Sequence, residues 1–113
     1  MLTRFDDCFS CHCCGTLPEN GMDEKLISVL NHMAVEEEEV NSGYRCPKHN
    51  AEVGGVPNSF HVQGCAADID ASTFGVDPLA ILAEQAGADG IGKYYDACFV
   101  HIDTRQYPAR WEE

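Results

Sequence analysis

The sequence predicts a single small α+β domain, in which short helices flank a small antiparallel sheet. The chain has 113 residues, the length of one domain, and apolar residues make up 44% of it, as is usual for a globular protein. Segments with helical periodicity and segments with strand alternation both occur, and no internal repeat or linker separates them. We therefore expect one domain over residues 1–113, beginning with a Cys-rich segment at residues 1–20.

The first predicted helix covers residues 23–35, after which four consecutive glutamates follow. An acidic first turn suits the start of a helix, since the helix dipole is positive there. Residues 36–39 are expected to form a solvated rim that leads into a strand at Val40. The apolar residues of the helix share one face, and they are Leu26, Ile27, Leu30 and Ala34.

Two further helices are predicted from their proline and glycine positions. Residues 47–53 begin with a proline, which is favoured in the first turn, and two glycines follow them. Asp77 is expected to cap the next helix, with Pro78 at its first position and an end near residue 85.

Three strands are predicted in the second half of the chain. Residues 58–64 are expected to form a loop before a strand over residues 65–70, in which acidic and apolar residues alternate between the two faces. Residues 90–95 and 98–103 are expected to form a hairpin with its turn at residues 96–97.

The charge of the chain is strongly negative and argues against several classes of partner. Nineteen acidic residues against seven Lys and Arg give a formal charge of −12, and the isoelectric point is about 4.6. Such a surface repels phosphate groups, so we expect no nucleic-acid partner and no anionic membrane surface as partner. No apolar run is long enough to span a bilayer, and we expect a monomer.

The seven cysteines cannot all pair within the chain, because their number is odd. Five of them form or could complete a cluster near the N-terminus, for which three interpretations stay open: a structural zinc site, a disulfide to the distant cysteine, or reduced thiols that pack a loop. Cys65 and Cys98 are expected to be small core residues. The candidate cluster residues are Cys8, Cys11, Cys13, Cys14 and Cys46.

Two segments carry residues that could bind a catalytic metal ion. A loop histidine, His61, precedes Asp68 on a predicted strand, and His101 lies on a second strand. Three nitrogen or oxygen ligands are typical of a catalytic zinc, because they leave a fourth position for water. On spacing alone, histidines that only pack in the core remain an alternative.

The pattern Ser-x-His-x-x-Gly-x-Ala-x-Asp, complete from Ser59 to Asp68, resembles the signature of the zinc D-Ala-D-Ala carboxypeptidase family, the M15 peptidases. Residues 41–58 and 90–111 extend the resemblance, which is strongest to compact phage and bacterial murein hydrolases. It implies a fold like that of DD-peptidases and the hedgehog domain. It also implies one catalytic zinc held by His61, Asp68 and His101, and cleavage of peptidoglycan stem peptides at D-amino acids.

The resemblance also suggests the other catalytic residues. Arg45 matches an arginine expected to stabilise the polarised carbonyl or to bind a substrate carboxylate. Several relatives place an acid where this chain has Cys98, so the general base is expected to be Asp103, with Asp96 as the alternative. Asp103 could instead fix the ring of His101.

Several alternatives stay open at this stage. The missing acid would also fit a zinc-binding scaffold of the same fold that has lost turnover, and the Cys-rich segment alone would fit a zinc knuckle without a catalytic metal. The sequence does not distinguish a carboxypeptidase from an endopeptidase. The first residues lack the apolar stretch of a signal peptide, so we expect cytoplasmic synthesis and release to the cell wall by lysis or phage machinery.

Overall fold

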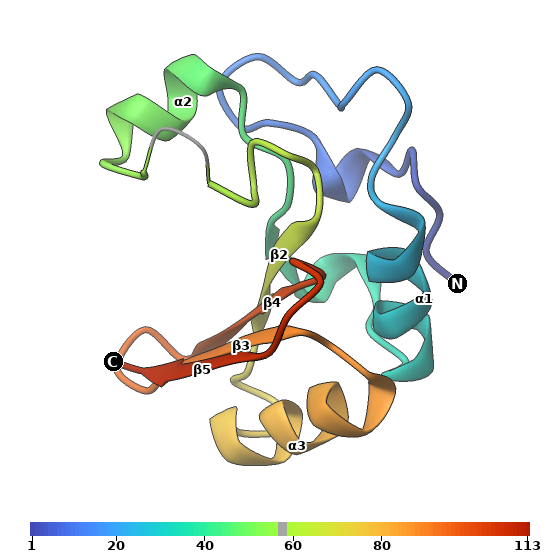
Figure 1. Cartoon of the computed structure of the whole chain (residues 1–113), viewed down its shortest axis with the longest axis vertical. Helices are drawn as coiled ribbons and strands as arrows, with labels where there is room; N and C mark the ends of the chain where they lie inside the picture. Colours follow the sequence, from blue (N-terminus) through green and yellow to red (C-terminus); the bar gives the residue numbers. More distant parts are fainter. Residues whose placement is uncertain (57–58) are drawn as a thin grey trace.

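The computed structural model describes residues 1–56 and 59–113 and confirms the α+β class (Figure 1). One five-stranded sheet has the strand order β1-β2-β4-β3-β5. Its strands are β1 (Val40–Ser42), β2 (Ala66–Asp70), β3 (Gly90–Tyr94), β4 (Phe99–Asp103) and β5 (Ala109–Glu112). The helices are α1 (Glu24–His32), α2 (Pro47–Glu52) and α3 (Val76–Ala86), with 3-10 turns at Asp7–Phe9 and Glu37–Glu39.

The sheet is mostly antiparallel, as predicted, and has one parallel pair at its edge. β1, β2, β4 and β3 pair antiparallel, whereas β5 pairs parallel with β3. The sequence pattern did not predict β5, because this strand has only four residues, and two of them, Arg110 and Glu112, are charged. Its addition to the edge of β3 places Trp111 opposite Gly92.

The core lies on one face of the sheet, where α1 and α3 pack against each other and α3 packs against β3 and β4 (Figure 1). Strand alternation sends Ala67 and Ile69 of β2 and Val100 and Ile102 of β4 into this core, and it sends the polar residues of both strands to the other face. Ala67 pairs with Ile102 on the core side, and Asp68 pairs with His101 on the opposite side.

The first half of the chain follows the predicted elements with small differences. The glutamate run leads into β1, as expected, and α2 begins at Pro47. α1 ends three residues earlier than predicted, because Ala34 adopts a left-handed conformation with φ of 57° and Val35 N–H donates to the Leu30 carbonyl. The expected loop 58–64 begins at a residue outside the described ranges, and residues 60–64 form turns.

The prediction that Asp77 caps α3 is wrong. The helix begins two residues earlier than predicted, at Val76, and Gly75 with φ of 89° is its cap. The Asp77 carboxylate instead accepts a hydrogen bond of 2.6 Å from the Tyr95 hydroxyl. Pro78 is tolerated because the first-turn N–H groups of a helix lack partners within the helix.

The β3–β4 hairpin agrees with the prediction to within one residue at each strand end. Its turn covers residues 95–98, and Cys98 has φ of 57° there. Among the described residues, no helix has both the length and the apolar character needed to cross a bilayer.

Candidate metal centre

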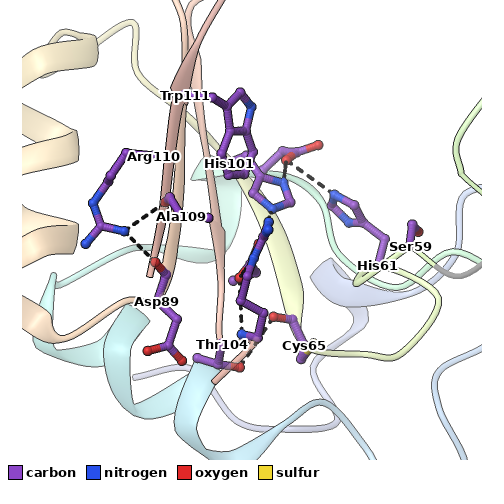
Figure 2. A network of polar contacts seen from close by, with 12 residues as sticks. Ser59, His61, Cys65, Asp89, His101, Thr104, Ala109, Arg110 and Trp111 are labelled. Atoms are coloured by element: carbon purple, nitrogen blue, oxygen red, sulfur yellow. Dashed lines mark hydrogen bonds and ion pairs between the residues drawn. The ribbon is translucent and has the colours of Figure 1, made fainter. Parts of the chain in front are cut away.

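Three predicted ligands converge on one point of the polar face of the sheet. Asp68 and His101 are register partners on β2 and β4, and His61 approaches them from the loop before β2. Asp68 Oδ1 lies 3.0 Å from His101 Nδ1 and 3.4 Å from His61 Nε2. All three side chains are buried, and one ligand atom from each lies within 4.8 Å of the others. Figure 2 shows the rings of His61 and His101 directed toward each other, with Trp111 beside His101.

Each imidazole is also held through its second nitrogen. His61 Nδ1 lies 2.7 Å from the Gly43 carbonyl oxygen, and His101 Nε2 lies 2.8 Å from Asp103 Oδ2. Because both partners are acceptors, each of these nitrogens carries the proton in a neutral ring, and the nitrogen that faces Asp68 keeps its lone pair. Histidines that bind zinc are usually held in this way. The donor set of two imidazoles and one carboxylate therefore fits a zinc ion with an open position.

The charges of the site are set by close hydrogen bonds. Burial would raise the pKa of the Asp68 carboxyl, but hydrogen bonds with His101 and His61 hold it well below its usual range. Burial would lower the pKa of His101, yet its bonds to Asp103 and Asp68 raise it. Since an imidazole must be deprotonated to bind a metal ion, these bonds make the proton a competitor of the metal at His101.

Asp103 lies on the far side of the His101 ring from Asp68, and its side chain is fully buried. Arg105 binds both of its oxygens, with Nε 2.9 Å from Oδ1 and Nη2 2.7 Å from Oδ2. Burial opposes ionisation, but the bonds with His101 and Arg105 hold the pKa of Asp103 well below its usual range. This position favours the alternative in which Asp103 fixes the ring of His101, rather than its expected role as general base.

The remaining predicted catalytic residues lie at different distances from this centre. Arg45 faces it, with Nη2 3.6 Å from Asp68 Oδ2. Asp96 is exposed in the β3–β4 turn and does not line the cavity over the metal ligands. Cys98 packs against the hydrophobic core, as expected. Cys65 is half-buried, and burial raises the pKa of its thiol to about 11.

A cavity of about 500 Å³ opens over the three ligands. Its wall includes Tyr94 and Phe99, whose rings stack with centroids 4.3 Å apart, and Trp111, whose indole N–H donates to the Tyr94 hydroxyl. Arg45 and Arg105 add two cationic groups to the lining. The cavity therefore combines aromatic surface with cations, which suits a peptide that carries carboxylates.

Several residues of this site were missed in the sequence. Arg105 follows Asp103 by two positions, so both lie near the same end of a predicted strand. This spacing in the sequence could have indicated that the two side chains pair. Asn50 is fully buried, and its amide oxygen accepts hydrogen bonds from Ser59 and Arg45, which links two matched motifs. No sequence pattern indicated that Trp111 would reach the site, because β5 pairs with β3 and not with β4, the strand that precedes it in the sequence.

The N-terminal cysteines gather at a second place. Cys11, Cys13, Cys14 and Cys46 have their sulfur atoms within 4.8 Å of one another. Cys8 does not belong to this group; it packs against the core, and burial raises the pKa of its thiol to about 11. Figure 1 shows the N-terminal segment and α2 together at one end of the molecule.

Comparison with known families gives one match. The sequence profile of the family described as Peptidase M15 matches residues 13–103, and this range contains all three candidate metal ligands. No curated protein shows significant similarity to the chain.

Proposed function

The chain belongs to the peptidase M15 family, and we propose that it is a zinc-dependent metallopeptidase that hydrolyses peptide bonds at D-amino acids in bacterial peptidoglycan. The observation that carries this proposal is the buried arrangement of His61, Asp68 and His101. Each of the two rings is fixed by an acceptor so that its free nitrogen faces the same point.

When bound there, zinc would act as a Lewis acid toward water and the scissile carbonyl. The zinc ion would be held by His61, Asp68 and His101. Because two of these ligands are neutral and one is a carboxylate, the ion and its ligands would together carry one net positive charge. Asp103 orients His101 and increases the basicity of its ring. Arg45 would stabilise the negative charge that develops on the carbonyl oxygen, since its guanidinium already faces the centre.

The proton acceptor is assigned by position among the remaining acids. Asp68 is the only acid among the described residues that line the cavity, and it is a proposed ligand. Asp103 has both oxygens occupied by His101 and Arg105. Asp96, the other expected base, lies outside the cavity in the exposed β3–β4 turn, so its role as proton acceptor stays a prediction.

The substrate assignment is supported by the shape and chemistry of the cavity. A stem peptide offers several carboxylates and small apolar D-alanine side chains, which match the two arginines and the aromatic wall. Both a carboxypeptidase and an endopeptidase are compatible with a cavity that is open to solvent. The products of the reaction distinguish the two.

The test uses purified peptidoglycan and a soluble stem pentapeptide, with products identified by mass spectrometry. We expect cleavage that is lost on treatment with a chelator and restored by zinc, and that is abolished in His61→Ala. A matched control is His32→Ala, which changes an exposed histidine of α1. Cleavage by His61→Ala at the wild-type rate would contradict the proposal. Zinc binding without cleavage of either substrate would favour the scaffold alternative.

A further inference from the structure

We propose that Cys11, Cys13, Cys14 and Cys46 bind a second, structural zinc ion through four thiolates. The cluster shares no residue with the candidate metal centre, so the proposal does not rest on the proposed peptidase activity. It combines three cysteines of the N-terminal segment with the cysteine that precedes α2.

The spacing of the sulfur atoms fits a tetrahedral ion. Zinc–thiolate bonds of about 2.3 Å place the sulfurs of a tetrahedron roughly 3.8 Å apart. Cys13 Sγ lies 3.6 Å from Cys11 Sγ and 3.3 Å from Cys46 Sγ, and every pair in the cluster lies within 4.8 Å. Small side-chain adjustments would therefore complete the coordination.

The local backbone explains how adjacent cysteines can serve one ion. Residues 12–14 form a turn, in which the Gly15 N–H donates to the Cys11 carbonyl and the Cys11 N–H donates to the Thr16 carbonyl. Gly15 has φ of 72°, a conformation that favours glycine. In such a turn, neighbouring side chains can converge, whereas in a strand they would point to opposite faces.

Backbone N–H groups are already directed at two of the sulfurs. Cys46 N–H donates to Cys11 Sγ, and His49 N–H donates to Cys46 Sγ, both at 3.4 Å. Such bonds favour the thiolate over the thiol, because a donor stabilises negative charge. A four-thiolate site carries excess negative charge even with zinc bound, so these donors support the assignment.

The cluster joins the N-terminal segment, which contains only the 3-10 turn Asp7–Phe9, to the start of α2. A small domain has a limited core, so a bound metal can supply a large part of its folding free energy. Cys46 directly follows Arg45, whose backbone N–H donates to the His61 carbonyl. A zinc ion on Cys46 would therefore also restrain the segment that brings Arg45 to the candidate metal centre.

Two other arrangements use the same residues. Cys13 and Cys46 are near enough to form a disulfide after oxidation, and Cys13 also lies within 4.8 Å of His49 and Glu52 ligand atoms. The cluster is favoured over both because Cys11 and Cys14 would have no role in either.

The experiment loads the full-length, reduced protein with cobalt(II) and records its absorption spectrum. We use the His61→Ala background, so that the cluster is the only proposed site that remains. The expected result is an intense thiolate-to-cobalt charge-transfer band with tetrahedral d–d bands, which zinc abolishes by displacement. These bands should be lost in Cys46→Ser and kept in Cys65→Ser, a matched change outside the cluster.

A measurement without cysteine variants covers the case in which Cys46→Ser does not fold. With zinc bound, the four cluster thiols of the wild-type chain should resist alkylation, as identified by peptide mass spectrometry, and a chelator should expose them. The proposal is overturned if reduced protein shows no thiolate–cobalt band, or if zinc leaves all four thiols reactive. A band that survives Cys46→Ser but not His49→Ala would instead assign the metal to Cys13, His49 and Glu52.

Discussion

Gly90 lies directly opposite Asp103 in the β3–β4 pair, and a β-carbon at position 90 would overlap the Asp103 carboxylate. The absence of a side chain on β3 thus makes the space for the buried acid that holds His101. The neighbouring Gly92 does the same for Trp111, whose ring would overlap a β-carbon there. Two glycines on one strand therefore make room for two residues that contact the same histidine.

Gly90→Ala should weaken both folding and zinc binding. The new methyl group must displace the Asp103 carboxylate, and overpacking of this kind costs about 1–3 kcal/mol. Chemical unfolding and a competitive zinc titration would measure the two effects. A control is Gly87→Asn, because asparagine is tolerated at the left-handed end of α3. Unchanged stability and zinc affinity in Gly90→Ala would contradict the close contact.

Asp103→Asn should lower the stability of the metal-free protein in a pH-dependent manner. The folded-state pKa of Asp103 is depressed, so its ionised form stabilises the fold above the unfolded pKa of about 4, and this stabilisation is lost as the pH falls. At pH 7 we expect a loss of about 1.5–3 kcal/mol, the usual value of hydrogen bonds to charged groups.

Urea unfolding of wild type and Asp103→Asn at pH 7 and at pH 3 measures this difference, with a chelator present throughout. The gap in unfolding free energy should shrink at pH 3. If the difference in unfolding free energy between the two proteins is the same at both pH values, the charge of the Asp103 carboxylate does not stabilise the fold.

Arg45→Lys should reduce turnover and leave zinc content unchanged. A lysine keeps the charge but loses the planar fork that can bind a developing oxyanion, and removal of one such donor costs roughly 10²–10³ in kcat. Steady-state kinetics on the stem pentapeptide, with zinc measured on the same samples, tests this. Arg110→Lys is a suitable control, because Arg110 pairs with Glu84 at the exposed edge of the sheet. Wild-type kcat in Arg45→Lys would remove Arg45 from the mechanism.

Trp111→Leu should weaken substrate binding more than turnover. The indole forms part of the cavity wall, with its ring centroid 5.2 Å from that of His101, but it offers no ligand atom to the metal. We expect KM to rise roughly tenfold, equivalent to about 1.4 kcal/mol, with zinc content retained. If kcat falls while KM stays constant, Trp111 acts on the ligand geometry instead of on the substrate.

The three proposed metal ligands, and the strands that carry Asp68 and His101, could be found in the sequence. Both the strand alternation and the motif that contains the ligands are patterns of residues near one another in the chain. Alternation of Asp68 with Ala67 and Ile69 predicts which side of β2 is polar, and the histidine spacing follows a known motif. The structure adds their convergence, which depends on the register between β2 and β4.

Features that depend on long-range pairing could not be found in this way. β5 forms a strand by pairing with the edge of β3. The Asp77 carboxylate does not cap α3, because it bonds with the Tyr95 hydroxyl and the Lys93 ammonium group instead. Cys8 packs against the core and does not join the cluster of the other N-terminal cysteines, and its spacing does not reveal this difference. The space that Gly90 leaves for the Asp103 carboxylate likewise appears only once β3 and β4 are aligned.

The pairing of Asp68 with His101 has a consequence for the folding of the sheet. A shift of β2 against β4 by one residue would turn Asp68 toward the apolar core while His101 stayed on the polar face, and the two side chains would be separated. The hydrophobic effect and the proposed metal coordination would thus favour the same alignment of the two central strands. Zinc affinity is for this reason a sensitive assay of correct strand alignment, and it can separate variants that are natively folded from variants that are merely compact.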